Sequence, residues 1–236
     1  IYRLLSSQKK TAAGPDGIPY WLFKHCALQL TPVIANIINK SILDGKPPNP
    51  WKHAIVTPVP KTAKPGTLGE LRPISVTSIL SRLTERLIVQ HYLLPAIPPD
   101  LIADQFAFRP SGSTTAALTF LVHHLTKFLE DCNYVRVLLI DYSKAFDSVN
   151  HEILADKLKA LPIPPFVLNW IINFLTGRTQ AVFCNGTMSR LLKITQSIVQ
   201  GSGLGPVLYL IMASNLKTLS PINRICKYAD DKTLMC

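Results

Sequence analysis

Apolar segments along the chain are separated by stretches rich in proline, glycine and charge, and their spacing predicts both helices and strands. Leucines near helical spacing predict two long helices, over Ser78–Leu94 and Thr114–Glu130. We expect the apolar stripes of these helices to face a core, and the stripes consist of Leu80, Leu83, Leu87 and Leu94, and of Leu118, Leu121, Leu125 and Phe128. Further helices are predicted over Pro19–Leu43, His151–Leu161, Phe166–Leu175 and Pro206–Leu216.

Short segments rich in β-branched residues and leucine predict strands, several of them bounded by prolines or polar turns. These segments are His53–Pro60, Leu71–Ser75, Val135–Ile140, Ala181–Cys184, Leu191–Ile198, Ile222–Tyr228 and Thr233–Cys236. Asn185-Gly186 is a strong hairpin signal, and Lys61–Glu70 reads as a basic loop. Helices and strands are mixed without strict alternation, which favours an α+β fold over a doubly wound sheet.

The composition is typical of a packed protein with a basic surface. Of the 236 residues, 47% are hydrophobic and 17% are charged, and the formal net charge is +11. Such a surplus of positive charge favours a nucleic-acid partner, because each neutralised phosphate releases counterions. The five cysteines are far apart and include no C-x-x-C pair, which argues against a zinc site or a disulfide framework. Reduced thiols of this kind are typical of an intracellular protein. No apolar run is long enough to span a membrane, so we expect no membrane partner.

Acidic residues follow two of the predicted strands. Asp141 comes directly after the apolar run that ends at Ile140, and Asp230-Asp231 follow Tyr228-Ala229. Adjacent carboxylates repel one another unless a cation lies between them, and Mg²⁺ prefers such hard oxygen ligands. Two such ions can activate an attacking hydroxyl and stabilise a leaving oxygen in phosphoryl transfer. These residues therefore predict a metal site for nucleotidyl transfer or for a nuclease, and their spacing does not distinguish the two.

Ordered motifs resemble those of the reverse transcriptases of non-LTR (LINE-type) retrotransposons over nearly the whole chain. Any one of them is weak evidence, but six in the family's order are specific. They are Gly14-Pro15-Asp16-Gly17, Leu71-Arg72-Pro73-Ile74-Ser75, Gln105-Phe106-Ala107-Phe108-Arg109, Asp141-Tyr142-Ser143-Lys144-Ala145-Phe146-Asp147, Gln200-Gly201-Ser202-Gly203-Leu204-Gly205-Pro206 and Tyr228-Ala229-Asp230-Asp231.

The resemblance implies a role for particular residues. It implies that Asp141, Asp230 and Asp231 are catalytic and bind two Mg²⁺ ions, with Mn²⁺ as an alternative and the backbone carbonyl of Tyr142 assisting. Asp231 either binds metal or positions the primer end. The implied nucleotide-binding residues are Lys61 and Arg72 at the triphosphate, Phe146 as an aromatic gate against a ribose 2′-hydroxyl, and Gln200 and Gly201. Tyr228 is expected to contact template or primer, and Arg109 either contacts the template or caps a helix.

The same resemblance implies the right-hand polymerase fold, with a palm built on an antiparallel sheet with packed helices. Residues 1–134 would form mainly the fingers and the start of the palm, and residues 135–236 mainly the palm that carries the catalytic motifs. The implied reaction adds deoxynucleotides to a DNA primer on an RNA template. The thumb is absent, so we expect the chain to be a fragment of a longer polyprotein that includes endonuclease and thumb regions. The parent element would act in nucleus and cytoplasm.

Two alternatives stay open at this point. Val199 stands where the family commonly has proline, Asn215 where it often has aspartate, and Lys232 directly follows the acidic pair. These departures are compatible with a catalytically inactive or degenerate nucleic-acid-binding remnant. The second alternative is a reverse transcriptase of the group II intron type.

Overall fold

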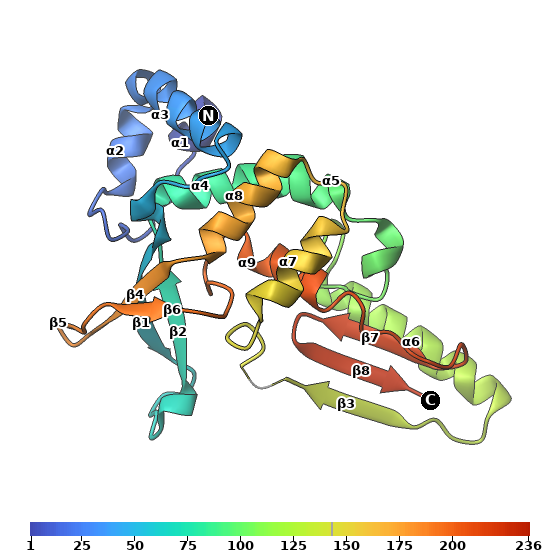
Figure 1. The fold of residues 1–236 in the computed structure, drawn as a ribbon. Helices are drawn as coiled ribbons and strands as arrows, with labels where there is room; N and C mark the ends of the chain where they lie inside the picture. The colour runs from blue at the N-terminus through green and yellow to red at the C-terminus, as the bar shows by residue number, and fades with distance from the viewer. Residues whose placement is uncertain (143) are drawn as a thin grey trace.

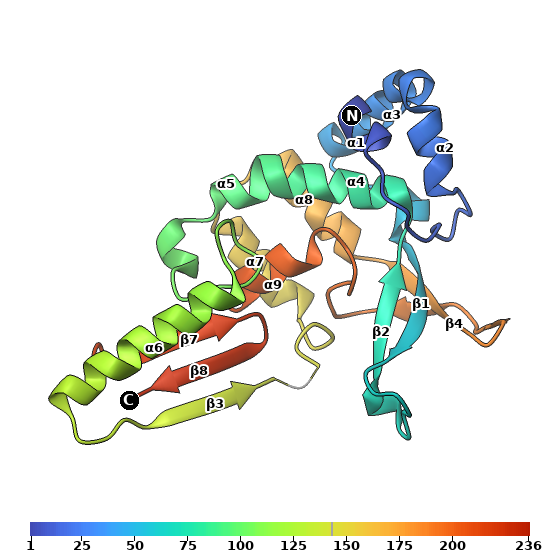
Figure 2. The same ribbon diagram turned by 180° about the vertical axis from the view of Figure 1, so that it is seen from behind.

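Two β-sheets lie on either side of a central group of helices in the computed structural model of the chain (Figure 1). The structure describes residues 1–142 and 144–236, so Ser143 of the first acidic motif lies outside the described residues. Figure 2 shows the same arrangement from behind, with both sheets extending away from the helix α4 (Ile79–Ile88).

The first sheet has the strand order β2-β1-β4-β5, and β6 also pairs with β4. Its strands are β1 (His53–Pro60), β2 (Leu71–Val76), β4 (Arg178–Cys184), β5 (Thr187–Met188) and β6 (Leu192–Ile194). β1 is antiparallel to β2 and parallel to β4, with His53 opposite Thr179. This sheet therefore draws strands from both halves of the chain.

The second sheet is antiparallel throughout and has the order β3-β8-β7. Its strands are β3 (Val137–Asp141), β7 (Arg224–Tyr228) and β8 (Asp231–Met235). The helix α6 (Thr114–Asp131) runs along one face of this sheet (Figures 1 and 2). α6 begins at a Ser113 cap, whose hydroxyl oxygen accepts a hydrogen bond from the backbone N–H of Ala116 at 3.0 Å. The helix α6 therefore supports the sheet whose strands β7 and β8 flank Ala229 and Asp230.

The remaining helices pack around the largest hydrophobic core, which includes the fully buried Trp170, Phe174 and Leu154. They are α1 (Tyr2–Ser6), α2 (Tyr20–His25), α3 (Ala27–Leu43), α5 (Leu94–Ala96), α7 (His151–Lys159), α8 (Pro165–Leu175) and α9 (Gly205–Met212). Short tight segments are η1 (Asn49–Lys52), η2 (Leu68–Glu70) and η4 (Pro99–Ile102), and η3 (Val89–Leu93) is a π-helical segment that continues α4 towards α5. No helix among the described residues is long and apolar enough to cross a membrane.

The predicted α+β class is confirmed, and two local expectations are corrected. The helix expected over Pro19–Leu43 is divided at Cys26, although Cys26 N–H still donates to the Leu22 carbonyl at 3.0 Å. Leu118 was expected in the core but is 62% exposed, because the narrow second sheet covers only the side of α6 that carries Ala117 and Leu121.

Candidate active site

Three carboxylates lie at one end of the second sheet. Asp141 is the last residue of β3 and faces Asp231, the first residue of β8, in antiparallel register. Ala229 and Asp230 form the turn between β7 and β8, and Ala229 adopts a left-handed backbone with φ of 55°. Because Asp230 precedes Asp231 directly, the register of three strands brings together the residues that the sequence predicts as metal ligands.

The chemistry of these donors fits a divalent cation. Among the described residues, no group of three or more His, Cys, Asp or Glu is arranged so that it could hold a metal ion. Mg²⁺, however, commonly takes only one or two protein carboxylates and completes its shell with substrate phosphates and water. The cross-strand pair Asp141 and Asp231, with Asp230 adjacent, can supply that number of ligands. Their assignment as ligands stays a prediction.

Tyr209 is a buried phenol close to the acidic turn. Burial raises the pKa of the Tyr209 phenol to about 12, and the charges of Asp230, Tyr142, Asp141 and Asp231 act in the same direction. Negative charge near a phenol disfavours its anion. Tyr209 therefore stays protonated at neutral pH and lies within the field of all three carboxylates.

A cavity of about 750 Å³ opens between the two sheets beside this acidic end. Its lining joins the basic loop and β2 to the acidic turn, and it includes the predicted residues Lys61, Arg72, Phe146, Gln200, Gly201 and Asp230. Asp141, Asp231 and Tyr142 do not line it, and neither do the predicted template contacts Arg109 and Tyr228. The structure thus places basic side chains and two carboxylates, Asp147 and Asp230, around one space large enough for a nucleotide.

The loop that begins at Gln200 is fixed against β2. The backbone carbonyl of Gln200 accepts a hydrogen bond from Ser75 N–H at 2.9 Å, and its side-chain Nε2 donates to Asp147 Oδ1 at 3.1 Å. Gly201 has φ of 102°, and a Cβ there would lie 2.8 Å from the Ser75 carbonyl oxygen. Only glycine can therefore occupy this position without moving the backbone of the cavity wall.

Glu85 holds the other side of the same loop, a role that the sequence analysis missed. Its Oε2 accepts hydrogen bonds from the backbone N–H groups of Gly203 and Leu204, at 2.8 and 3.2 Å. Its Oε1 accepts one from the Ser81 hydroxyl at 2.8 Å. Burial raises the pKa of Glu85, and these three donors and the nearby Arg178 oppose the increase. A charged residue on the buried side of α4 was the available clue.

Aromatic side chains form the wall of the cavity opposite the basic loop. The ring of Phe146 stacks on Tyr209, with centroids 4.8 Å apart and planes 14° apart. Phe108 meets Phe146 edge-on, with centroids 6.3 Å apart. Phe146 and Phe108 both line the cavity, whereas Tyr209 lies behind Phe146. The predicted gate residue is therefore held from two directions.

Lys232 is buried next to the acidic turn, with only 2% of its surface exposed. Its ammonium donates to the Tyr209 hydroxyl oxygen at 2.9 Å and to the Asp230 carbonyl at 2.8 Å, and it lies 4.4 Å from the ring centroid of Tyr142. Burial lowers the pKa of Lys232, whereas the charges of Asp230, Asp231 and Asp141 oppose that effect. The sequence marked this lysine only as a departure from the family pattern.

Gln105 connects the segment 99–109 to the acidic turn. Its Oε1 accepts hydrogen bonds from the backbone N–H groups of Ala107 at 2.9 Å and Ala229 at 3.0 Å. Phe106 N–H donates to the Lys227 carbonyl, and Lys227 N–H to the Asp104 carbonyl, both at 2.8 Å. Gln105 is buried, so its side chain fixes the left-handed Ala229 from inside the protein.

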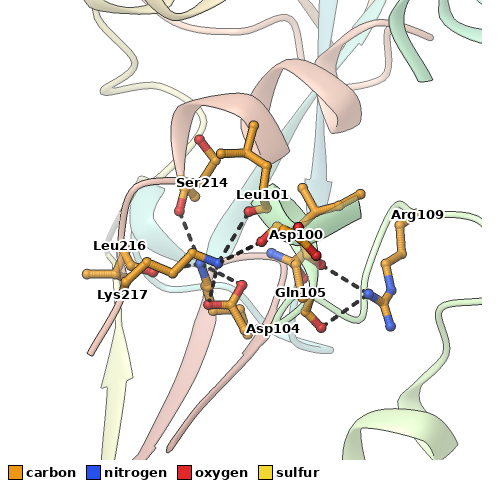
Figure 3. Close-up of polar contacts among 12 residues, drawn as sticks. Asp100, Leu101, Asp104, Gln105, Arg109, Ser214, Leu216 and Lys217 are labelled. Atoms are coloured by element: carbon orange, nitrogen blue, oxygen red, sulfur yellow. Dashed lines mark hydrogen bonds and ion pairs between the residues drawn. The ribbon is translucent and has the colours of Figure 1, made fainter. Parts of the chain in front are cut away.

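An ion-pair cluster fixes the same segment to β7 (Figure 3). The Asp104 carboxylate lies 3.0 Å from the ammonium of Lys217 and 3.0 Å from that of Lys227. Lys227 is buried, and its ammonium also donates to the Leu216 carbonyl at 2.8 Å. Burial lowers the pKa of Lys227, and Asp104 opposes this change. The cluster joins β7 and the segment 99–109 to Leu216 and Lys217, which follow α9 in the chain.

The other predicted residues have structural contacts of their own. Arg109 Nη1 donates to the Ile102 carbonyl at 3.0 Å and the Ala103 carbonyl at 3.2 Å (Figure 3), and its guanidinium lies over the Phe106 ring. Lys61 Nζ donates to the Gly69 carbonyl at 3.0 Å. Tyr228 pairs in register with Asp231 and packs against the small cluster under α6. That Arg109 and Tyr228 contact template or primer stays a prediction.

Comparisons with known proteins agree with the ordered motifs. Residues 59–236 match the family described as reverse transcriptase (RNA-dependent DNA polymerase). The chain is 34% identical over 240 residues to the RNA-directed DNA polymerase from mobile element jockey of Drosophila melanogaster, covering 96% of this chain and 26% of that protein. It is 27% identical over 202 residues to the Pol polyprotein from retrotransposable element R2 of Popillia japonica, covering 85% and 27%. The chain spans about a quarter of the length of these relatives.

Solved structures share the fold at low sequence identity. A telomerase from Candida albicans in complex with a fragment of telomeric RNA superposes with a TM-score of 0.55 at 12% identity, covering 96% of this chain and 45% of that one. An apo telomerase from Candida tropicalis gives 0.51 at 14% identity, covering 89% and 49%. These similarities concern the fold alone.

Proposed function

The chain belongs to the reverse transcriptase family, with relatives among non-LTR retrotransposons, and from this premise we propose that it adds deoxynucleotides to a primer 3′-hydroxyl on an RNA template. The observation that carries the proposal is the cavity of about 750 Å³, whose lining combines Lys61 and Arg72 with Asp230. An incoming nucleoside triphosphate needs cations for its phosphates at one side and an acidic metal site at its reacting phosphorus.

Each group of residues that lines the cavity would bind a different part of the nucleotide. Arg72 would grip phosphate oxygens through its planar guanidinium, and Lys61 would add a second positive charge. Phe146 would lie against the sugar and would exclude a ribose 2′-hydroxyl there. Gln200 and Gly201 would line the side of the base, and the absence of a side chain at Gly201 allows close approach of the backbone.

Asp141, Asp230 and Asp231 are the residues that we propose hold divalent ions, Mg²⁺ or Mn²⁺, with help from the Tyr142 carbonyl. When bound, such ions supply charge stabilisation for the attacking and leaving oxygens of phosphoryl transfer. The protein contributes the placement of these carboxylates, through the β3–β8 register and the Gln105 contact to the turn. Pyrophosphate is the expected leaving group.

RNA template, DNA primer and deoxynucleoside triphosphates are the proposed partners, and the net charge of +11 favours such polyanions. We further propose that residues 1–134 form mainly the fingers and residues 135–236 mainly the palm. The relatives are several times longer, which supports a parent polyprotein with endonuclease and thumb regions. Nucleus and cytoplasm are the proposed sites of action of that parent.

Template-directed incorporation tests the proposal against the alternative of a non-catalytic nucleic-acid-binding remnant. The chain and the longest reading frame that contains it would be given poly(rA)/oligo(dT), Mg²⁺ and either dTTP or dGTP. We expect primer extension with dTTP and little with dGTP, because the template selects the complementary nucleotide. Binding of the duplex without extension by either protein would favour the remnant, and incorporation without regard to template would overturn the proposal.

A further inference from the structure

The aromatic wall of the nucleotide cavity has a second layer. Phe146 lines the large cavity, and Tyr209 stacks on its far side at 4.8 Å. Behind Tyr209 lies a second cavity of about 350 Å³, whose lining includes Tyr142, Tyr209, Met212 and Lys232, and Ala145 lines both cavities. A side chain at position 146 therefore has empty space behind it, and Tyr209 is the ring that separates it from that space.

Tyr209 is itself held in place. It comes from the buried helix α9, and its hydroxyl oxygen accepts a hydrogen bond from the Lys232 ammonium at 2.9 Å. The same ammonium donates to the Asp230 carbonyl and lies over the rings of Tyr142 and Tyr209. Burying a lysine is costly unless its charge finds partners, so these contacts are the ones that keep Lys232 in position.

We propose that Tyr209 and Lys232 are positioning residues that fix Phe146 and thereby set the discrimination between deoxyribonucleotides and ribonucleotides. The inference rests on the proposed polymerase function. Neither residue lines the nucleotide cavity, so both act through Phe146. Without the Tyr209 ring, Phe146 can move back into the smaller cavity, and the space opened beside the sugar admits a 2′-hydroxyl.

The relation between the two residues follows from their contacts. Removing the Tyr209 ring removes the stack on Phe146 altogether. Removing only its hydroxyl, or only the Lys232 ammonium, breaks the same hydrogen bond to the ring and leaves the ring in place. The lysine change also removes the bond to the Asp230 carbonyl, which does not contact Phe146 in the stack and should lower the use of both nucleotides alike. The two smaller changes should therefore have similar effects, and combining them should add little to either alone.

Competing incorporation of rUTP and dTTP on poly(rA)/oligo(dT) tests the inference, with kcat/KM measured for each nucleotide. We expect Tyr209→Leu to raise the rUTP/dTTP ratio about tenfold, since small displacements at a reacting site have large effects. Tyr209→Phe and Lys232→Met should each raise it about threefold, and the double variant Tyr209→Phe/Lys232→Met by no more than about threefold. Met212→Leu is the matched control, because Met212 lines the smaller cavity without belonging to the stack.

Each outcome is decisive. General destabilisation lowers the use of both nucleotides alike, so an unchanged ratio in Tyr209→Phe and Lys232→Met overturns the inference even where Tyr209→Leu fails to fold. A ratio that changes equally in Met212→Leu overturns it as well. If the wild-type protein neither extends the primer nor binds dTTP in equilibrium dialysis, the proposed function is wrong, and the inference that rests on it is wrong as well.

Discussion

The side-chain oxygen of Gln105 accepts a hydrogen bond from the backbone N–H of Ala229 at 3.0 Å, so a residue of one motif holds the turn of another. These positions are 124 apart in sequence. Ala229 has a left-handed backbone, which an alanine adopts only at some energetic cost, and the buried amide of Gln105 offsets that cost. The position of Asp230 therefore depends on the segment 99–109 as well as on its own hairpin.

Replacing Gln105 with leucine should destabilise the protein by about 1–3 kcal/mol, because two buried N–H groups lose their acceptor. Urea unfolding measures this free energy. Gln90→Leu is the control, since Gln90 is exposed, and its effect should stay within about 0.5 kcal/mol. Similar costs for the two variants would show that Gln105 does not support the turn.

Asp104 should contribute more to the free energy of unfolding than its exposed partner Lys217. Asp104→Ala leaves the buried Lys227 ammonium without its counter-ion and should cost about 3 kcal/mol or more of unfolding free energy. Lys217→Ala removes the partner whose side chain is 42% exposed and should cost less than about 1 kcal/mol. Thermal or urea unfolding of both variants measures these free energies. A larger loss of unfolding free energy in Lys217→Ala than in Asp104→Ala would refute the prediction.

Glu85 should give the stability a distinctive pH dependence. Burial raises its pKa above the ordinary value of 4.5, so between that value and its folded-state pKa the folded protein binds more protons than the unfolded chain. The stability of the wild type relative to Glu85→Gln should therefore be greatest at low pH and fall as pH rises through the folded-state pKa. Urea unfolding of both proteins at about pH 5, 6 and 7 measures the difference. A difference that grows with pH would contradict the assignment.

Gly201→Ala should cost more than Gly177→Ala, although both glycines have positive φ. At Gly201 the new Cβ meets the Ser75 carbonyl oxygen at 2.8 Å, whereas at Gly177 no atom lies within 4 Å. We expect about 2 kcal/mol or more for the first and about 1 kcal/mol for the second. Equal losses in denaturant unfolding would mean that the Gln200 loop does not pack against β2 as described.

The positions of most helices and strands along the chain were predictable from the sequence. The strand His53–Pro60 was predicted to the residue, because prolines and a β-branched run define it. The pairing of that strand with β4 was not predictable, since the partners His53 and Thr179 are far apart in the chain and local pattern carries no information about them. Leu118 was predicted wrongly because a periodic stripe does not tell how much of a helix its neighbours cover.

The candidate site was predictable where ordered motifs exist. Lys61, Arg72, Phe146, Gln200 and Gly201 were expected around one nucleotide, and they line one cavity with Asp230. The residues that support this cavity from behind were not predicted. Glu85, Gln105 and Lys232 are single polar residues in apolar surroundings, and their roles appear only when the fold brings their partners within hydrogen-bonding distance.

The measurement that tests the central claim most directly is Mg²⁺-dependent extension of oligo(dT) on poly(rA) by the wild type and by Asp141→Ala and Asp230→Ala. Asp156→Ala is the matched control, because Asp156 lies exposed on α7 and pairs only with Lys159 among the described residues. We predict that the wild type and Asp156→Ala extend the primer and that both other variants lose extension while still binding the duplex. Extension retained in Asp141→Ala or Asp230→Ala would contradict the assignment of the acidic site.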